Sequence, residues 1–251
     1  MQQNFSLKEL QKIVLRFKST IAISLLTLIA FIFLSNASFF ISTRELLKLA
    51  LTSFQLENAV HYMLIHVGYK HLAVNLVSFI AFSLVAEFVL GSKHAFAIFW
   101  ISGIVAGMTY VLLNPNIALI GASAGVSGLL GAAFVSDWKK TLLAILAMLF
   151  ITVFFVYPLT SGAFDEFKKS ITQKQTTIQS DLNKAIEQKD FNKAADLNKN
   201  LQQTTQIIEQ TQKGEKFAEQ TPTSNEIHAF GAIIGIGYVL VLKKYKKKSK
   251  V

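Results

Sequence analysis

Residues 120–131 read Ile-Gly-Ala-Ser-Ala-Gly-Val-Ser-Gly-Leu-Leu-Gly, an apolar segment rich in glycine with a hydroxyl near its start. Small residues recur at every fourth position, at Gly121 and Gly125 and again at Ser123 and Ser127. In lipid, such small faces let a second helix backbone come close, so that the helices associate through packing and hydrogen bonds. The segment therefore predicts a membrane helix with a close partner.

The last hydrophobic segment carries a matching small face at Gly231 and Gly235, just after a lone His228. We predict that the two small faces meet, so that Ser123 and His228 form a nucleophile and base pair inside the bilayer. Taken alone, a serine in such a helix is more often a packing residue, and a histidine near a helix end is more often interfacial. The prediction therefore depends on the residues around them.

Composition places the chain among membrane proteins with several spans, because 52% of its 251 residues are hydrophobic and only 16% are charged. The net charge of +10 does not indicate nucleic-acid binding, since the basic residues gather in short segments beside the apolar runs. Thiol chemistry and disulfides are excluded, because the sequence contains no cysteine.

The apolar runs predict an all-α membrane protein with six spans and both termini in the cytoplasm. The predicted cytoplasmic segments hold thirteen basic residues, against three in the first external loop. The chain then divides into five parts: a cytoplasmic tail (1–18), a core of five spans (19–159), an external segment (160–226), a sixth span (227–242) and a basic tail (243–251).

The segment 160–226 differs in composition, with nine lysines that nearly balance ten acidic residues. Its apolar residues recur at helical spacing, which predicts a hairpin of two helices with Asp190 capping the second. A solvated linker with partial helicity is the alternative.

Polar side chains at membrane depth are costly, so each is a functional hypothesis. His71 and Asn75 are four residues apart and share a helix face, whereas Glu87 lies roughly 24 Å further along the helix and cannot orient a base near His71. Glu226 is too close in sequence to His228 to be a third member, so we expect a dyad. His71, Asn75 and the backbone N–H of Ser123 would stabilise a developing oxyanion.

Other chemistries find no support in the sequence. There is no HExxH motif, no pair of intramembrane aspartates and no phosphate-binding Gly-Lys-Ser/Thr. On a helix, His66 and His71 would lie about 140° apart, which makes them a poor chelating pair. We expect no metal and no cofactor.

Taken together, these residues resemble the rhomboid family of intramembrane serine proteases. The resemblance covers residues from about 60 to 240 apart from the segment 160–226, and its motifs are His66-x4-His71-x3-Asn75, Ala86-Glu87-x3-Gly91, Gly121-Ala122-Ser123-Ala124 and His228-x2-Gly231-x3-Gly235.

The resemblance implies a six-helix core in which Ser123 is the nucleophile and His228 the general base, with His71, Asn75 and the Ser123 amide as the oxyanion site. It implies that His66 supports the external loop and that Glu87 ties helix ends together. Single-pass membrane proteins cut near the outer face of a bacterial-type plasma membrane are the expected substrates. No nucleic acid or cofactor is expected, and the long segment 160–226 is expected to contact protein as a gate or docking arm.

Three places depart from the family pattern: Glu57-Asn58 stands where a Trp-Arg pair is usual, Ser127 replaces an aromatic residue, and Glu226-Ile227 replaces small residues. The departures at Ser127 and Glu226 keep open a catalytically inactive rhomboid-like protein that binds or escorts membrane helices. A transporter would require intramembrane charges along a path or an inverted repeat, and the sequence has neither.

Overall fold

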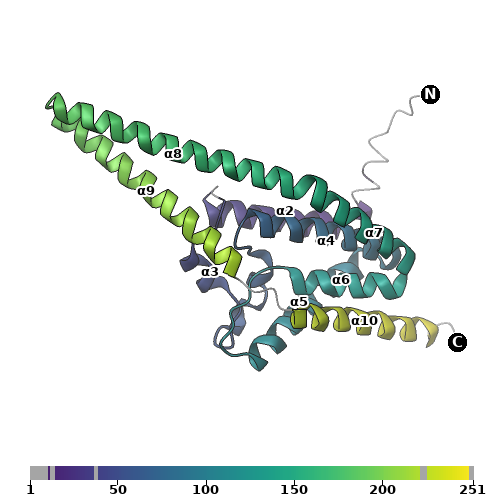
Figure 1. Cartoon of the computed structure of the whole chain (residues 1–251). Coiled ribbons are helices and arrows are strands. Elements are labelled where there is room, and N and C mark those ends of the chain that lie inside the picture. The colour runs from purple at the N-terminus through teal and green to yellow at the C-terminus, as the bar shows by residue number, and fades with distance from the viewer. Residues whose placement is uncertain (1–10, 12–14, 37–38, 221–224, 249–251) are drawn as a thin grey trace, which may run out of the picture.

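The structure is a computed structural model that describes residues 11, 15–36, 39–220 and 225–248. It is all-helical, with a bundle from which a long helical hairpin projects (Figure 1). Most of the predicted N-terminal tail (1–10 and 12–14) and the end of the basic tail (249–251) lie outside the described residues.

Within the described residues, five helices are long and apolar enough to cross a membrane. They are α2 (Lys18–Ser35), α4 (Tyr69–Leu90), α5 (Ser92–Leu113), a continuous helix over Trp138–Glu187, and α10 (Asn225–Lys248). The fourth of the six predicted spans, α6 (Ser123–Ser136), is apolar but only 14 residues long. At the helical rise it extends about 21 Å, less than the roughly 30 Å of a hydrocarbon core.

Helix α6 is the centre of the bundle, because it packs against α4, α5, α7 and α10. Eight of its 14 residues are buried. A helix that is apolar on every side suits such a position. Gly91 joins the C-terminal end of α4 to the N-terminal end of α5, and its φ of 92° is in the region that favours glycine.

The segment between α2 and α4 folds back onto the bundle. It contains α3 (Thr43–Leu49) and two short 3-10 helices, η1 (Leu56–Ala59) and η2 (His61–Leu64). Leu51 exchanges two backbone hydrogen bonds with Leu119, at 3.0 and 2.9 Å. These bonds tie the segment to the residues that lead into α6.

The predicted boundary at residue 160 coincides with no helix end. Helix α7 (Trp138–Ile151) continues through a π-helical turn, η3 (Thr152–Val156), into α8 (Tyr157–Glu187). Pro158 explains the wider turn, because proline lacks an N–H and its ring clashes with the carbonyl four residues earlier. The fifth predicted span is thus continuous with the first helix of the hairpin.

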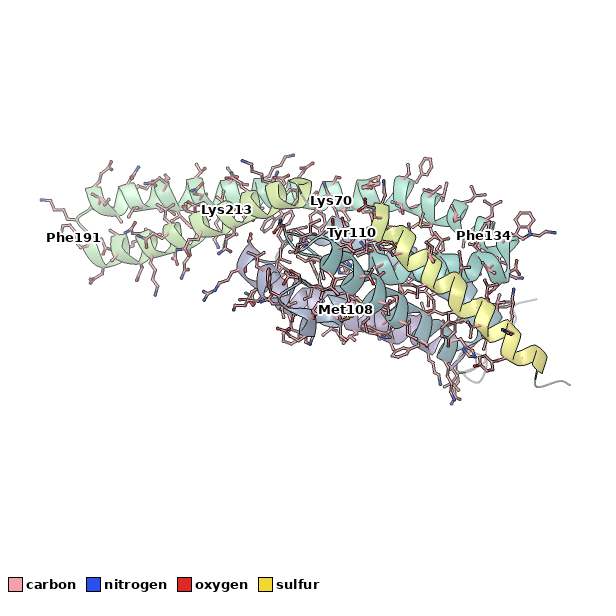
Figure 2. The ribbon with its side chains drawn as sticks, turned by 90° about the horizontal axis from the view of Figure 1, so that it is seen from below. Lys70, Met108, Tyr110, Phe134, Phe191 and Lys213 are labelled. Atoms are coloured by element: carbon pink, nitrogen blue, oxygen red, sulfur yellow. The ribbon has the colours of Figure 1, made fainter. Side chains whose placement is uncertain are left out.

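The segment predicted as a hairpin forms two long helices over most of its length. Helix α8 and α9 (Phe191–Gln220) pack side by side, and Lys168 forms an ion pair with Glu215 at 2.7 Å. Asp190 caps α9 as predicted, since its carboxylate accepts a hydrogen bond from the Lys193 N–H at 3.1 Å. Phe191 marks the far end of the hairpin, at the opposite end of the molecule from Phe134 of α6 (Figure 2).

Candidate functional site

Ser123 is the first residue of α6, and the backbone before it sets its position. Gly121 has a φ of 112°, which a residue with a side chain rarely adopts. Its N–H donates to the Tyr62 carbonyl at 2.8 Å, so the segment 51–68 holds the start of α6. The Ser123 side chain is half-buried.

The His71 ring lies against Gly121. A methyl group placed on Gly121 would lie 3.0 Å from Cε1 and 3.2 Å from Nε2 of His71. His71, on the first turn of α4, therefore packs against Gly121, which precedes the predicted nucleophile Ser123 by two residues. This close approach and the positive φ together favour glycine at this position.

Asn75 lies one turn after His71 on α4, as the spacing predicts. Its side-chain Nδ2 donates to the His71 carbonyl at 3.0 Å. An amide nitrogen carries two hydrogens, so one remains for another acceptor. Both residues are half-buried.

Helices α6 and α10 meet backbone to backbone at the turn that follows Ser123 and His228. A methyl group on Gly231 would collide with the Ala124 carbonyl, and one on Gly235 with the Gly128 carbonyl. Ile227, the residue before His228, packs in one cluster with Ala124. The start of α10 is therefore beside the start of α6.

The predicted contact face of α6 needs a correction. Gly125 does not face α10, because a methyl group there would lie 2.7 Å from the Phe99 carbonyl of α5, and Gly121 faces His71. Successive helical residues are about 100° apart, and residues four apart share a face. Ala124 and Gly128 therefore face a different neighbour from Gly121 and Gly125. Gly231 and Gly235 do face α6, as expected.

His71 and His228 lie within electrostatic range of each other, although they are far apart in sequence. Among the described residues, no hydrogen bond joins the Ser123 hydroxyl to the His228 ring. Catalytic hydrogen bonds are often long in ligand-free sites and shorten when substrate binds. His228 is half-buried.

His66 lies before α4, not on it, so His66 and His71 are not separated by the angle of about 140° expected for two positions on one helix. The His66 side chain is fully buried, and its ring meets the His71 ring edge to face with centroids 5.1 Å apart. The part of the chain that the structure describes contains no group of three or more acidic, histidine or cysteine side chains able to hold a metal.

Glu87 lies far from this site, at the other end of α4. It is 2% exposed, and one carboxylate oxygen accepts from the Thr20 backbone N–H at 2.6 Å and from the Thr20 hydroxyl at 2.9 Å. The other accepts from the Ser92 hydroxyl at 2.5 Å. The carboxylate therefore joins α2, α4 and α5.

Tyr62 supports the site and was not identified from the sequence. Its hydroxyl donates to the Gly103 carbonyl at 2.6 Å, while its own carbonyl accepts from Gly121. Burial raises the pKa of Tyr62. Gly103 and Gly107, four residues apart on α5, indicate in the sequence that something packs closely against this helix. In the structure they contact the side chains of Met63 and Tyr62, not another helix.

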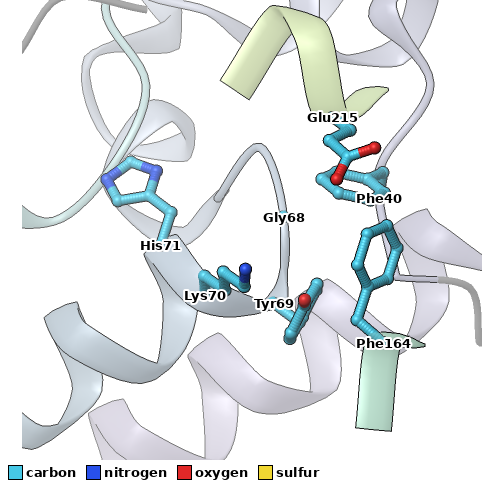
Figure 3. A pocket seen from close by; sticks show the side chains of 7 residues that line it. All are labelled: Phe40, Gly68, Tyr69, Lys70, His71, Phe164 and Glu215. Carbon is cyan, nitrogen blue, oxygen red and sulfur yellow. The ribbon is translucent and has the colours of Figure 1, made fainter. Parts of the chain in front are cut away.

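A pocket of about 220 Å³ borders His71 on the side of the hairpin (Figure 3). Phe40, Tyr69 and Phe164 form an aromatic wall, with ring centroids 5.4 to 5.9 Å apart. Glu215 of α9 lies on the other side of the pocket from His71. The base of the hairpin is thus next to the predicted oxyanion residue.

Residues 53–173 match the family model described as the rhomboid domain. No curated protein and no solved structure matches the chain.

Proposed function

Because the chain carries a rhomboid domain over residues 53–173, we propose that it is an intramembrane serine endopeptidase that cuts transmembrane-helix substrates near the outer membrane face. The observation that carries the proposal is the backbone contact between α6 and α10, together with His71 against Gly121. These two contacts bring the motifs that contain His71, Ser123 and His228 to one end of the bundle.

In the proposed mechanism, the Ser123 hydroxyl attacks the scissile carbonyl carbon while His228 takes its proton. The carbonyl oxygen becomes an oxyanion, which accepts hydrogen bonds from His71, Asn75 and the Ser123 backbone N–H. The intermediate expels the amine, which receives the proton from His228, and leaves an acyl-enzyme. Water, activated by His228, then hydrolyses the ester and restores Ser123. No cofactor takes part.

The proposed topology has six spans with both termini in the cytoplasm, and α6 is the short fourth span. Since α6 is about 21 Å long, its Ser123 end lies below the outer surface when its other end is at the inner surface. A substrate helix would therefore have to unwind near the outer face to present a peptide bond. Single-pass membrane proteins are the proposed substrates and a bacterial-type plasma membrane the proposed location.

A fluorophosphonate probe tests the proposal, because it reacts with an activated serine. The wild-type protein should be labelled, and Ser123→Ala should lose all labelling. Ser127→Ala is the matched control, since Ser127 is one turn further along the same helix and is also half-buried; it should still be labelled.

The alternative is a catalytically inactive rhomboid-like protein that binds or escorts membrane helices. The absence of a direct hydrogen bond between Ser123 and His228 in the described residues favours it. An unlabelled wild-type protein that still binds membrane helices would replace the peptidase by this alternative.

A further inference from the structure

An apolar groove of about 610 Å³ runs between α4 and α7, away from the proposed catalytic site. Val77 to Phe88 of α4 form one wall, and Lys140 to Ile151 of α7 form the other. Lys140 is the one charged residue among those that line it. The groove lies on the face of α7 that the rest of the bundle leaves largely uncovered.

The length of the groove matches one leaflet of a bilayer. Lys140 and Ile151 are eleven residues apart on one helix, which corresponds to about 16 Å at the helical rise. A leaflet contributes about half of the roughly 30 Å hydrocarbon core. An acyl chain that enters at Lys140 would therefore reach the middle of the membrane near Ile151.

Positive charge gathers at one end of the groove. The Arg16 guanidinium lies 4.2 Å from the centre of the Phe88 ring, and the Lys140 ammonium lies 5.4 Å from it. Asp137 forms an ion pair with Lys140 and offsets part of its charge. Lys139 is the neighbour of Lys140 but lies over Trp138 instead, 5.8 Å from that ring, and does not line the groove.

We propose that this groove binds one anionic phospholipid, with its phosphate between Arg16 and Lys140 and an acyl chain along the groove toward Ile151. Basic residues beside membrane helices attract acidic headgroups, and an apolar channel one leaflet deep fits the chain of the same molecule. A soluble anion would leave the channel empty, and a zwitterionic lipid has no net charge for the two cations.

The test measures lipid retention by native mass spectrometry of the full-length protein, purified in detergent with added phosphatidylglycerol or phosphatidylcholine. The wild-type protein should retain one phosphatidylglycerol in preference to phosphatidylcholine. Each of Arg16→Gln and Lys140→Gln should weaken that retention about fivefold. Equal retention of the two lipids would overturn the proposal.

Two variants separate this site from general attraction to a basic surface. Lys139→Gln removes the same charge from the adjacent residue and should leave retention unchanged; a loss equal to that of Lys140→Gln would overturn the proposal. Asp137→Asn should strengthen retention, because it frees the charge of Lys140 while asparagine still caps the start of α7. Weaker retention in a normally folded Asp137→Asn protein would contradict the assignment.

A groove-filling variant tests the acyl chain. Ala144 lies in the wall of the groove, so Ala144→Phe should lower phosphatidylglycerol retention without changing any charge. Glycerol 3-phosphate, which has the headgroup chemistry but no chain, should not compete. Full retention by Ala144→Phe would show that no acyl chain lies in the groove, and displacement of the lipid by glycerol 3-phosphate would show that the headgroup alone is bound. Either result would overturn the proposal.

Discussion

His66 is a fully buried histidine packed against the ring of a second histidine. Burial, and to a smaller extent the charge on His71, lowers the pKa of His66 from its ordinary value of 6.5 to about 3. The folded protein therefore keeps this ring neutral, because a charged imidazole without solvent is costly.

This pKa predicts acid sensitivity. Below about pH 6.5 the unfolded chain binds a proton at His66 that the folded chain does not, so the free energy of unfolding should fall as the pH falls from 6.5 toward 3. Above 6.5 this residue should have no effect. The midpoint of thermal unfolding in detergent, followed from pH 8 to pH 4, measures the slope.

The matched variants for this prediction are His66→Gln and His61→Gln. His66→Gln should flatten the slope between pH 6.5 and 4, even if it lowers stability at every pH. His61 is exposed, so His61→Gln should keep the wild-type slope. An unchanged slope in His66→Gln would mean that another group is responsible.

At the scale of elements, the contact between α6 and α10 is close because it is built on glycine. Gly235→Ala should force the two backbones apart, and overpacking of this kind costs about 1–3 kcal/mol. Gly237→Ala is the control, since nothing lies within 4 Å of an added methyl group there. It should be neutral or stabilise α10 by up to about 1 kcal/mol.

Thermal unfolding and fluorophosphonate labelling, measured on both proteins, check this prediction. Gly235→Ala should lower both the unfolding midpoint and the labelling rate, since α10 carries His228. Equal behaviour of the two variants would mean that the glycine contact does not position α10.

The hairpin can be shortened without breaking its contacts with the bundle. Lys168 and Glu215 lie side by side, and Phe164 and Gly214 pack against Phe40 below them. We predict that deletion of Lys169 to Gln212, with a short linker in its place, leaves the bundle folded and Ser123 reactive to the probe, but changes which membrane proteins are cut.

Comparison of shed protein ectodomains from cells that carry the full-length or the shortened protein measures the effect of the deletion. Ser123→Ala cells provide the background. An unchanged set of substrates would discard the idea that the hairpin is a gate or docking arm.

At the scale of the whole molecule, the proposed topology places the hairpin outside and the basic tail inside. The chain has no cysteine, so a single introduced cysteine reports only its own side. In intact cells, a membrane-impermeant maleimide should label Gln188→Cys, in the turn of the hairpin, and should label Lys244→Cys only after the membrane is opened. The reverse pattern would contradict the topology.

Much of the architecture follows from local patterns. The apolar runs predicted six spans, and five of them coincide with helices that are long and apolar enough to cross a membrane. The helical period of 160–226 predicted two helices with Asp190 capping the second, and α8, α9 and the Asp190 cap agree with that pattern. The predicted boundary at residue 160 lies within a continuous helix, because a change from apolar to polar composition does not end a helix. The backbone bonds of α7 and α8 continue across it, with one wide turn before Pro158.

The sequence by itself determined which segments are helical, where small residues allow close packing, and which polar side chains are costly in lipid, because these depend on neighbours within a turn or two. Only the tertiary structure decided that Ala124 and Gly128, and not Gly125, face α10, that His71 lies on Gly121, and that Tyr62 fills the space beside the α5 glycines. Each of these depends on how a helix is rotated about its own axis. That rotation is fixed by the packing of residues far apart in the chain.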